Sequence, residues 1–316
     1  MDKNGFIKYL ENKDYAQKTI SHSVRCVDLF FRQISKEDIQ ITAPDVLKYL
    51  EYLKNVKKLQ NVSCATHLTA LKHYFSFLYH TGQIDRNPCL LLKIRGTKRK
   101  ILHKIYTPDE LDEFFDNYYQ LFVRNYDHSR IKSDRGRKLS ALGRERNAAI
   151  LSILVHQGII TTEAGRIEIQ DLDLIKATLK IRGTKNHNER TIPLKATQIG
   201  LLMHYLHHIR PQLLEYQAAE TDKLFLALPA IDKKKKENDI TDKVFVQLSN
   251  QIKTIDKQFI NLQQVRASVI TFWVKTQGLR KAQYLAGHRF VSSTEKYVYN
   301  DLDDLTDDIN KLHPFL

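Results

Sequence analysis

Residues 285–297 read LAGHRFVSSTEKY, and this stretch puts a Gly-His pair nine residues before a tyrosine. Upstream, Arg266 stands 22 residues before His288, at the end of the run QQVR. Still further upstream, Lys185 lies in a polar turn that leads into the run ERTIPL. A lysine, an arginine, an imidazole and the phenol of Tyr297 therefore follow one another in a defined order.

This order resembles that of the tyrosine recombinase family, also called the phage integrase family. In that family a phenol attacks a DNA phosphorus and stays attached as an ester, which keeps the reaction reversible. The resemblance implies that Tyr297 is the nucleophile and that Lys185 is the general acid for the leaving 5′-oxygen. It further implies that Arg266 and His288 bind the phosphate, since the planar fork of an arginine matches two phosphate oxygens.

Alternatives exist for two of these residues. Tyr299 follows two residues after Tyr297, but the nine-residue spacing from His288 favours Tyr297. Three basic residues lie close enough to Lys185 to compete for the role of acid: Lys180, Arg182 and Arg190.

The chain departs from the family's pattern at its first catalytic arginine. The family usually has Gly-Leu-Arg-x-x-Glu-Leu, whereas residues 158–164 read GIITTEA, so Ile160 occupies the arginine's place. Some integrases of mobile elements lack this arginine and still recombine. Arg166 is the first candidate to replace it, and the alternative for Arg166 is a surface ion pair. Three further arginines are weaker candidates: Arg144, Arg146 and Arg182.

A second departure affects the family's His-x-x-Arg motif. Here the motif reads QQVR, so Gln263 stands in place of the histidine. Glutamine still donates a hydrogen bond to a phosphate oxygen, but it cannot act as acid or base at neutral pH.

The composition favours a polyanionic partner and argues against a membrane-spanning protein, a disulfide-rich protein and a cysteine-based metal site. The 316 residues include 50 Lys and Arg against 36 Asp and Glu, which gives a formal net charge of +14. No run of about 18 apolar residues is present, so we expect no membrane span. Cys26, Cys64 and Cys89 fit neither a disulfide framework nor a metal site, and we expect buried free thiols.

The amino-terminal part of the chain is expected to be a separate, mainly α domain. Apolar residues recur at helical spacing through residues 1–92, which predicts a compact bundle of four helices. By resemblance this is a SAM-like core-binding domain that contacts DNA. Residues 93–105 are predicted to be a basic linker along a phosphate backbone, or else a solvated loop. The linker carries six cations: Lys93, Arg95, Lys98, Arg99, Lys100 and Lys104.

Residues 106–316 are predicted to form a mixed α/β domain, mostly helical with one small antiparallel sheet. This matches a tyrosine recombinase catalytic domain. Residues 107–110, TPDE, predict a capped helix start. The basic polar stretch 124–146 is expected to interrupt the helices, and a hairpin is expected between 178 and 194. A short last helix is expected within 301–312.

We therefore expect a site-specific DNA recombinase or integrase that works through a covalent 3′-phosphotyrosyl intermediate, without metal or cofactor. The partner is double-stranded DNA, with a homotetramer on two DNA sites held by the C-terminal helix; folding of that helix onto its own domain is the alternative. The other functional hypothesis, favoured by Ile160 and Gln263, is a catalytically impaired DNA-binding protein that acts as a regulator or assembly factor. Composition and resemblance indicate a prokaryotic cytoplasmic protein without a membrane partner.

Overall fold

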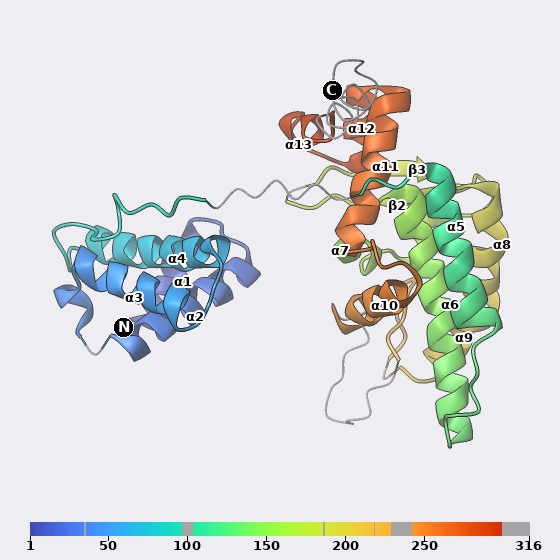
Figure 1. Cartoon of the computed structure of the whole chain (residues 1–316), viewed down its shortest axis with the longest axis horizontal. Coiled ribbons are helices and arrows are strands. Elements are labelled where there is room, and N and C mark those ends of the chain that lie inside the picture. Colours follow the sequence, from blue (N-terminus) through green and yellow to red (C-terminus); the bar gives the residue numbers. More distant parts are fainter. Residues whose placement is uncertain (35, 97–103, 186, 218, 229–241, 299–316) are drawn as a thin grey trace, which may run out of the picture. The chain divides into compact units, whose positions relative to one another are not determined.

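The computed structural model describes residues 1–34, 36–96, 104–185, 187–217, 219–228 and 242–298. The chain divides into two compact units, Met1–Ile101 and Leu102–Leu316 (Figure 1). Each unit has its own hydrophobic core. Among the helices of the described ranges, none has the length and apolar character needed to cross a bilayer.

The described residues of the first unit form four α-helices: α1 (Lys3–Asn12), α2 (Gln17–Gln33), α3 (Ala43–Asn55) and α4 (Asn61–His80). Their apolar faces meet in a core where the rings of Phe6 and Tyr74 pack edge to face, with centroids 5.2 Å apart. At the start of α3, Thr42 and Asp45 form a capping box. The predicted four-helix bundle is confirmed, and the three cysteines are free and buried.

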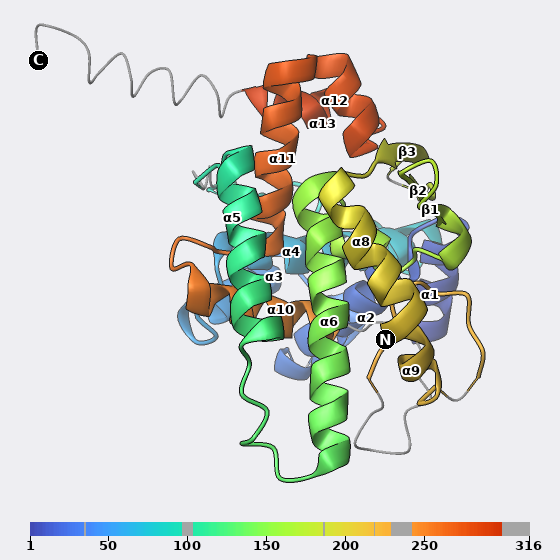
Figure 2. The same cartoon turned by 90° about the vertical axis from the view of Figure 1, so that its right-hand side faces the viewer.

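The second unit is mostly helical. Its helices are α5 (Pro108–Tyr119), α6 (Asp134–Gln157), α7 (Thr161–Ala164), α8 (Ala196–His204), α9 (Arg210–Leu214), α10 (Asp242–Ile255), α11 (Leu262–Gln277), α12 (Leu279–Ala286) and α13 (Ser292–Glu295). Helix α6 is central and packs against α5, α8 and α11 (Figure 2). The predicted capping box at the start of α5 is present, between Thr107 and Glu110.

A three-stranded antiparallel sheet completes the second unit, in the order β1 (Leu172–Asp173), β2 (Thr178–Ile181), β3 (Arg190–Pro193). The small sheet expected from the sequence is therefore confirmed. In the β2–β3 register, Ile181 lies opposite Arg190. The hairpin loop docks on the end of α12, where Asn188 N–H donates to the Gly287 carbonyl at 2.8 Å. This contact brings the hairpin beside His288.

The expected interruption at residues 124–146 is wrong for most of its length, because α6 already begins at Asp134. Ser133 caps the helix by accepting a hydrogen bond from Gly136 N–H at 3.1 Å. Asp134 lies in the first turn, where the positive end of the helix dipole stabilises its negative charge. The arginines and lysines that follow are good helix formers, so a run of polar residues is not by itself evidence for a loop.

Three predictions from the sequence concern residues outside the described ranges. One is the expected last helix, at 301–312, and another is the alternative nucleophile Tyr299. The third comprises three cations of the linker: Lys98, Arg99 and Lys100.

Candidate active site

Arg266, His288 and Tyr297 lie together within a single chain, and we refer to these three residues as the cluster. Arg266 projects from α11 and is 4% exposed. Its Nη2 lies 3.3 Å from Nε2 of His288. The rings of His288 and Tyr297 stack with their centroids 6.0 Å apart and an angle of 14° between their planes. No exchange of segments between subunits is needed to bring these three groups together.

Backbone carbonyls hold the guanidinium of Arg266. It donates to the carbonyl of Gly158 at 2.5 Å and to that of Ala286 at 2.8 Å. Gly158 ends α6 with a φ of +52°, and a Cβ there would lie 2.9 Å from Cγ1 of Val269. The position therefore requires glycine for its conformation and for its clearance. The carbonyls at the C-terminal ends of α6 and α12 thus fix the orientation of the Arg266 side chain.

Gly287 explains why the Gly-His pair needs its glycine. The residue follows α12 with a φ of +70°, and a Cβ there would collide with the guanidinium of Arg190. The next residue, His288, places Nδ1 2.9 Å from Oγ1 of the buried Thr294. The turn therefore fixes the direction of the imidazole.

His288 is a neutral imidazole at neutral pH. Burial lowers the pKa of His288 to about 4, with a further contribution from the positive charge of Arg266. A guanidinium only donates, so Nε2 of His288 accepts from Arg266. In a neutral ring Nδ1 then carries the proton and donates to Thr294. His288 therefore helps to orient Arg266.

The phenol of Tyr297 is half-buried and protonated at neutral pH. Burial raises its pKa, and the nearby guanidinium of Arg266 opposes that shift. A protonated phenol is a weak nucleophile, so the hydroxyl must lose its proton as it attacks. The neighbouring cation stabilises the negative charge that develops on the oxygen.

A buried ion pair between Arg190 and Glu163 lies next to Arg266, and the sequence did not reveal it. Nη1 and Nη2 of Arg190 donate to the two carboxylate oxygens of Glu163 at 2.8 and 2.9 Å. Arg190 also donates from Nε to the Leu285 carbonyl at 2.8 Å. Glu163 accepts from Ile160 N–H at 3.0 Å. Burial opposes ionisation of Glu163, but Arg190 outweighs it and lowers the pKa of this carboxyl.

This ion pair joins the elements that carry the cluster. Glu163 belongs to α7, Arg190 to β3, and Leu285 to α12. Arg266 of α11 is also close, with Nη1 3.9 Å from a Glu163 oxygen. The hints in the sequence were the glutamate of the GIITTEA run and the arginine of ERTIPL. No local pattern reports their pairing, because the two residues are 27 positions apart and belong to different elements.

Replacing Glu163 with glutamine should strongly destabilise the catalytic unit. The substitution leaves Arg190 buried without its counter-charge, and removing one partner of such a pair costs about 3–5 kcal/mol. Urea unfolding can be followed by the fluorescence of Trp273, the only tryptophan, which is buried in the core of this unit. As a control, Glu168→Gln breaks a partly exposed pair with Arg182 and should cost far less. Equal losses in the two variants would contradict the structural role of the buried pair.

The remaining predicted catalytic residues, Lys185, Gln263 and Arg166, are exposed. Lys185 is exposed near the tip of the β2–β3 hairpin. Gln263 is exposed one helical turn before Arg266 on α11. Arg166 is exposed two residues after α7; its backbone N–H donates to the Glu163 carbonyl at 2.9 Å, whereas its side chain forms no hydrogen bond or ion pair with another described residue. Ile160, half-buried, is the residue immediately before α7.

The weaker candidates for the missing arginine are engaged elsewhere, and Arg144 lies over the ring of Tyr126, with its Cζ 3.1 Å from the ring centroid. Arg182 pairs with Glu168 at 2.7 Å and with Asp171 at 3.0 Å. Arg146 is fully buried and donates to the Leu226 carbonyl at 2.9 Å.

Three of the predicted linker cations are described. Lys93 and Arg95 are exposed, and the carbonyl of Arg95 accepts a hydrogen bond from Asn61 at 3.0 Å. Lys104 forms an ion pair with Glu110 at 2.7 Å. Within the described ranges, no group of three or more His, Cys, Asp or Glu side chains is arranged to hold a metal ion.

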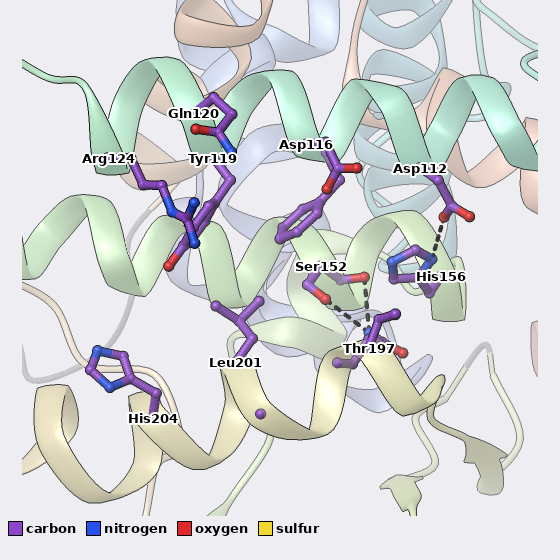
Figure 3. Close-up of a pocket in the computed structure, with 13 residues that line it drawn as sticks. Asp112, Asp116, Tyr119, Gln120, Arg124, Ser152, His156, Thr197, Leu201 and His204 are labelled. Carbon is purple, nitrogen blue, oxygen red and sulfur yellow. Dashed lines mark hydrogen bonds and ion pairs between the residues drawn. The ribbon is translucent and has the colours of Figure 1, made fainter.

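A pocket between α5, α6 and α8 does not include the cluster (Figure 3). Its wall includes Asp112, which pairs with Lys195 at 2.8 Å and lies 3.4 Å from Nδ1 of His156. Burial, together with the charge of Lys195, lowers the pKa of His156 to about 4. These polar groups satisfy one another, and the pocket is separate from the candidate active site.

Comparison with known proteins agrees with this geometry. Residues 133–303 match the model of the phage integrase family, and residues 4–82 match that of the phage integrase N-terminal SAM-like domain. Tyrosine recombinase XerC of Anoxybacillus flavithermus is 28% identical over 314 residues, covering 96% of this chain and 94% of the relative. XerC of Pelotomaculum thermopropionicum is 27% identical over 311 residues, covering 94% and 90%.

Solved structures share the fold at low sequence identity. XerH site-specific recombinase bound to palindromic difH substrate, in a post-cleavage complex, superposes with a TM-score of 0.66 at 19% identity, covering 95% of this chain and 81% of that chain. A lambda integrase dimer bound to a COC′ core site gives 0.61 at 14% identity and covers 92% of each chain. The chain therefore belongs to the phage integrase family of tyrosine recombinases, enzymes of site-specific DNA recombination.

Proposed function

We propose that this protein is a catalytically active recombinase that cuts and rejoins duplex DNA through a covalent 3′-phosphotyrosyl intermediate. The observation that supports this most directly is the contact of Tyr297 with His288, and of His288 with Arg266, within one chain. A protein that only bound DNA would not need a nucleophilic phenol beside a buried guanidinium. Ile160 and Gln263, which replace an arginine and a histidine of the family's pattern, are the observations that favour a catalytically impaired DNA-binding protein.

The proposed reaction begins with attack of the Tyr297 oxygen on the scissile phosphorus. The bond from phosphorus to the 5′-oxygen breaks, the phenol releases its proton to solvent water, and the 5′-oxygen receives a proton from Lys185. Arg266 neutralises charge that develops on the non-bridging oxygens. Attack by the 5′-hydroxyl of a second strand then reverses the chemistry and releases the phenol.

Gln263 has a supporting role in this proposal. It is exposed three residues before Arg266, so both side chains lie on the same face of α11. Its amide can donate one hydrogen bond to a phosphate oxygen.

We propose double-stranded DNA as the partner, with residues 1–92 as the core-binding domain, 93–105 as the basic linker and 106–316 as the catalytic domain. The net charge of +14 and the exposed cations Lys93 and Arg95 support this assignment. A homotetramer on two DNA sites is part of the proposal. One structural relative is described as a lambda integrase tetramer bound to a Holliday junction.

The experiment that tests the function is trapping on a suicide substrate. The protein's high-affinity site is first selected from a random DNA library. A nick placed next to the cleavage position then lets a short fragment diffuse away, so that the covalent intermediate accumulates. A protein–DNA adduct that survives denaturation supports an active recombinase. Tight binding to the selected site without any adduct would favour a regulator or assembly factor.

Arg166→Ala tests the candidate replacement for the missing arginine. If Arg166 binds the phosphate once DNA is present, the variant should lose about 10³-fold or more in cleavage rate, as removal of an arginine finger does. DNA affinity should stay within a few-fold, because one exposed cation among many contributes little to total binding. Single-turnover cleavage at saturating DNA measures this, and a near-normal rate would rule Arg166 out.

A further inference from the structure

A second histidine, His187, lies against the cluster, and the sequence did not single it out. It follows the hairpin tip, and its backbone pairs with that of His288 in an isolated β-bridge. The two imidazole centroids are 6.3 Å apart. The His187 ring is half-buried, and neither of its nitrogens hydrogen-bonds another residue in the described ranges. It is therefore a free hydrogen-bonding group beside the proposed phosphate site.

The backbone on both sides holds His187 in this place. Its N–H donates to Oγ1 of Thr184 at 3.1 Å, and its carbonyl accepts from Thr184 N–H at 2.8 Å. The next residue, Asn188, donates to the Gly287 carbonyl at 2.8 Å. These contacts position the ring without using its nitrogens, which is the arrangement a group that binds a ligand requires.

The cluster needs another donor for a phosphate. Arg190 is committed to Glu163 and to the Leu285 carbonyl, so its guanidinium is occupied within the protein. Ile160 has no polar atom in its side chain. Arg266 is thus the buried cation that remains near Tyr297 to meet charge on the non-bridging oxygens.

We propose that His187 contacts the scissile phosphate and supplies a hydrogen-bond donor that Ile160 cannot. This rests on the proposed recombinase function. A neutral imidazole already donates one N–H, and an adjacent phosphodiester anion favours the doubly protonated ring. Burial lowers the pKa of His187 in the free protein, where Glu163 opposes the shift and Arg266 and Arg190 add to it. The ring is therefore neutral in the free protein at neutral pH.

A double-mutant cycle between positions 160 and 187 tests this proposal. Cleavage of the suicide substrate at saturating DNA is measured for the wild type, His187→Ala, Ile160→Arg and the double variant. His187→Ala should cleave about 10²-fold more slowly, as expected for loss of one preorganised donor. In the Ile160→Arg background the same change should cost less than about 10-fold, because the guanidinium restores the missing contact. An equal loss in both backgrounds would overturn the proposal in favour of a purely structural role.

A conservative variant and a matched control complete the test. His187→Gln keeps a donor and should retain most of the rate, whereas equal losses for His187→Gln and His187→Ala would overturn the proposal even if Ile160→Arg fails to fold. Glu189→Ala removes an exposed side chain of the same hairpin, paired with Lys180 at 3.0 Å, and should leave cleavage unchanged. A wild-type protein without any adduct would refute the recombinase function itself. A normal adduct with an unaffected His187→Ala would refute only the role of His187.

Discussion

Tyr297→Phe should reduce the covalent protein–DNA adduct to below detection while leaving DNA affinity within a few-fold. Phenylalanine keeps the ring that packs against His288 and the core and removes only the hydroxyl. Without that oxygen no ester with the 3′-phosphate can form, so the loss is complete rather than partial. The measurement is a denaturing gel of the suicide-substrate reaction, with DNA binding measured separately on the same preparation.

Tyr299→Phe is the matched control for this prediction. Tyr299 was the competing nucleophile in the sequence, and only Tyr297 has the nine-residue spacing from His288. The control should form the adduct at the wild-type rate. Adduct that persists in Tyr297→Phe but disappears in Tyr299→Phe would transfer the nucleophile to Tyr299. Mass spectrometry of the DNA-linked peptide gives an independent assignment.

The fold was predictable wherever local chemistry agrees with the final structure. Apolar residues at helical spacing correctly predicted the helices of the first unit, and the capping signal at Thr107 correctly predicted the start of α5. The start of α6 was missed because many cations in succession look like a loop, whereas the buried face of this helix begins only at Leu142. Local polarity thus predicted a loop wrongly at the start of α6, because only the later part of this long helix is buried in the core.

The candidate site was predictable only in part, for a physical reason. The spacing of Arg266, His288 and Tyr297 reflects a short chain path, α11 to α12 to α13, and is therefore written in the sequence. The pair of Glu163 with Arg190 joins residues from different elements, so no local pattern reports it. The position of His187 likewise depends on how the hairpin docks on Gly287.

Arg266→Ala should lower the cleavage rate at saturating DNA by about 10³–10⁵-fold, as loss of a transition-state arginine does in phosphoryl transfer. Arg266 hydrogen-bonds His288, whose ring stacks on that of Tyr297, and Ile160 offers no second guanidinium to share its task. Arg266→Lys should rescue little. The guanidinium already donates to the Gly158 and Ala286 carbonyls, and a single ammonium cannot keep both contacts and reach the phosphate as well.

Arg280→Ala is the control for this prediction, because it removes one positive charge, as Arg266→Ala does, at an exposed position outside the cluster. Arg280→Ala removes one exposed cation from α12, where the side chain of Arg280 hydrogen-bonds only Gln283 among the described residues. It should weaken binding slightly at low salt and leave the saturated cleavage rate unchanged, because screened surface charges act on association rather than on the reacting phosphate. Arg266→Ala that cleaves within 10-fold of the wild type, under conditions where Arg280→Ala is normal, would mean that the phosphate is held by other groups. The clustering of Arg266 with Tyr297 would then be structural, and the catalytic assignment of the whole cluster would fail with it.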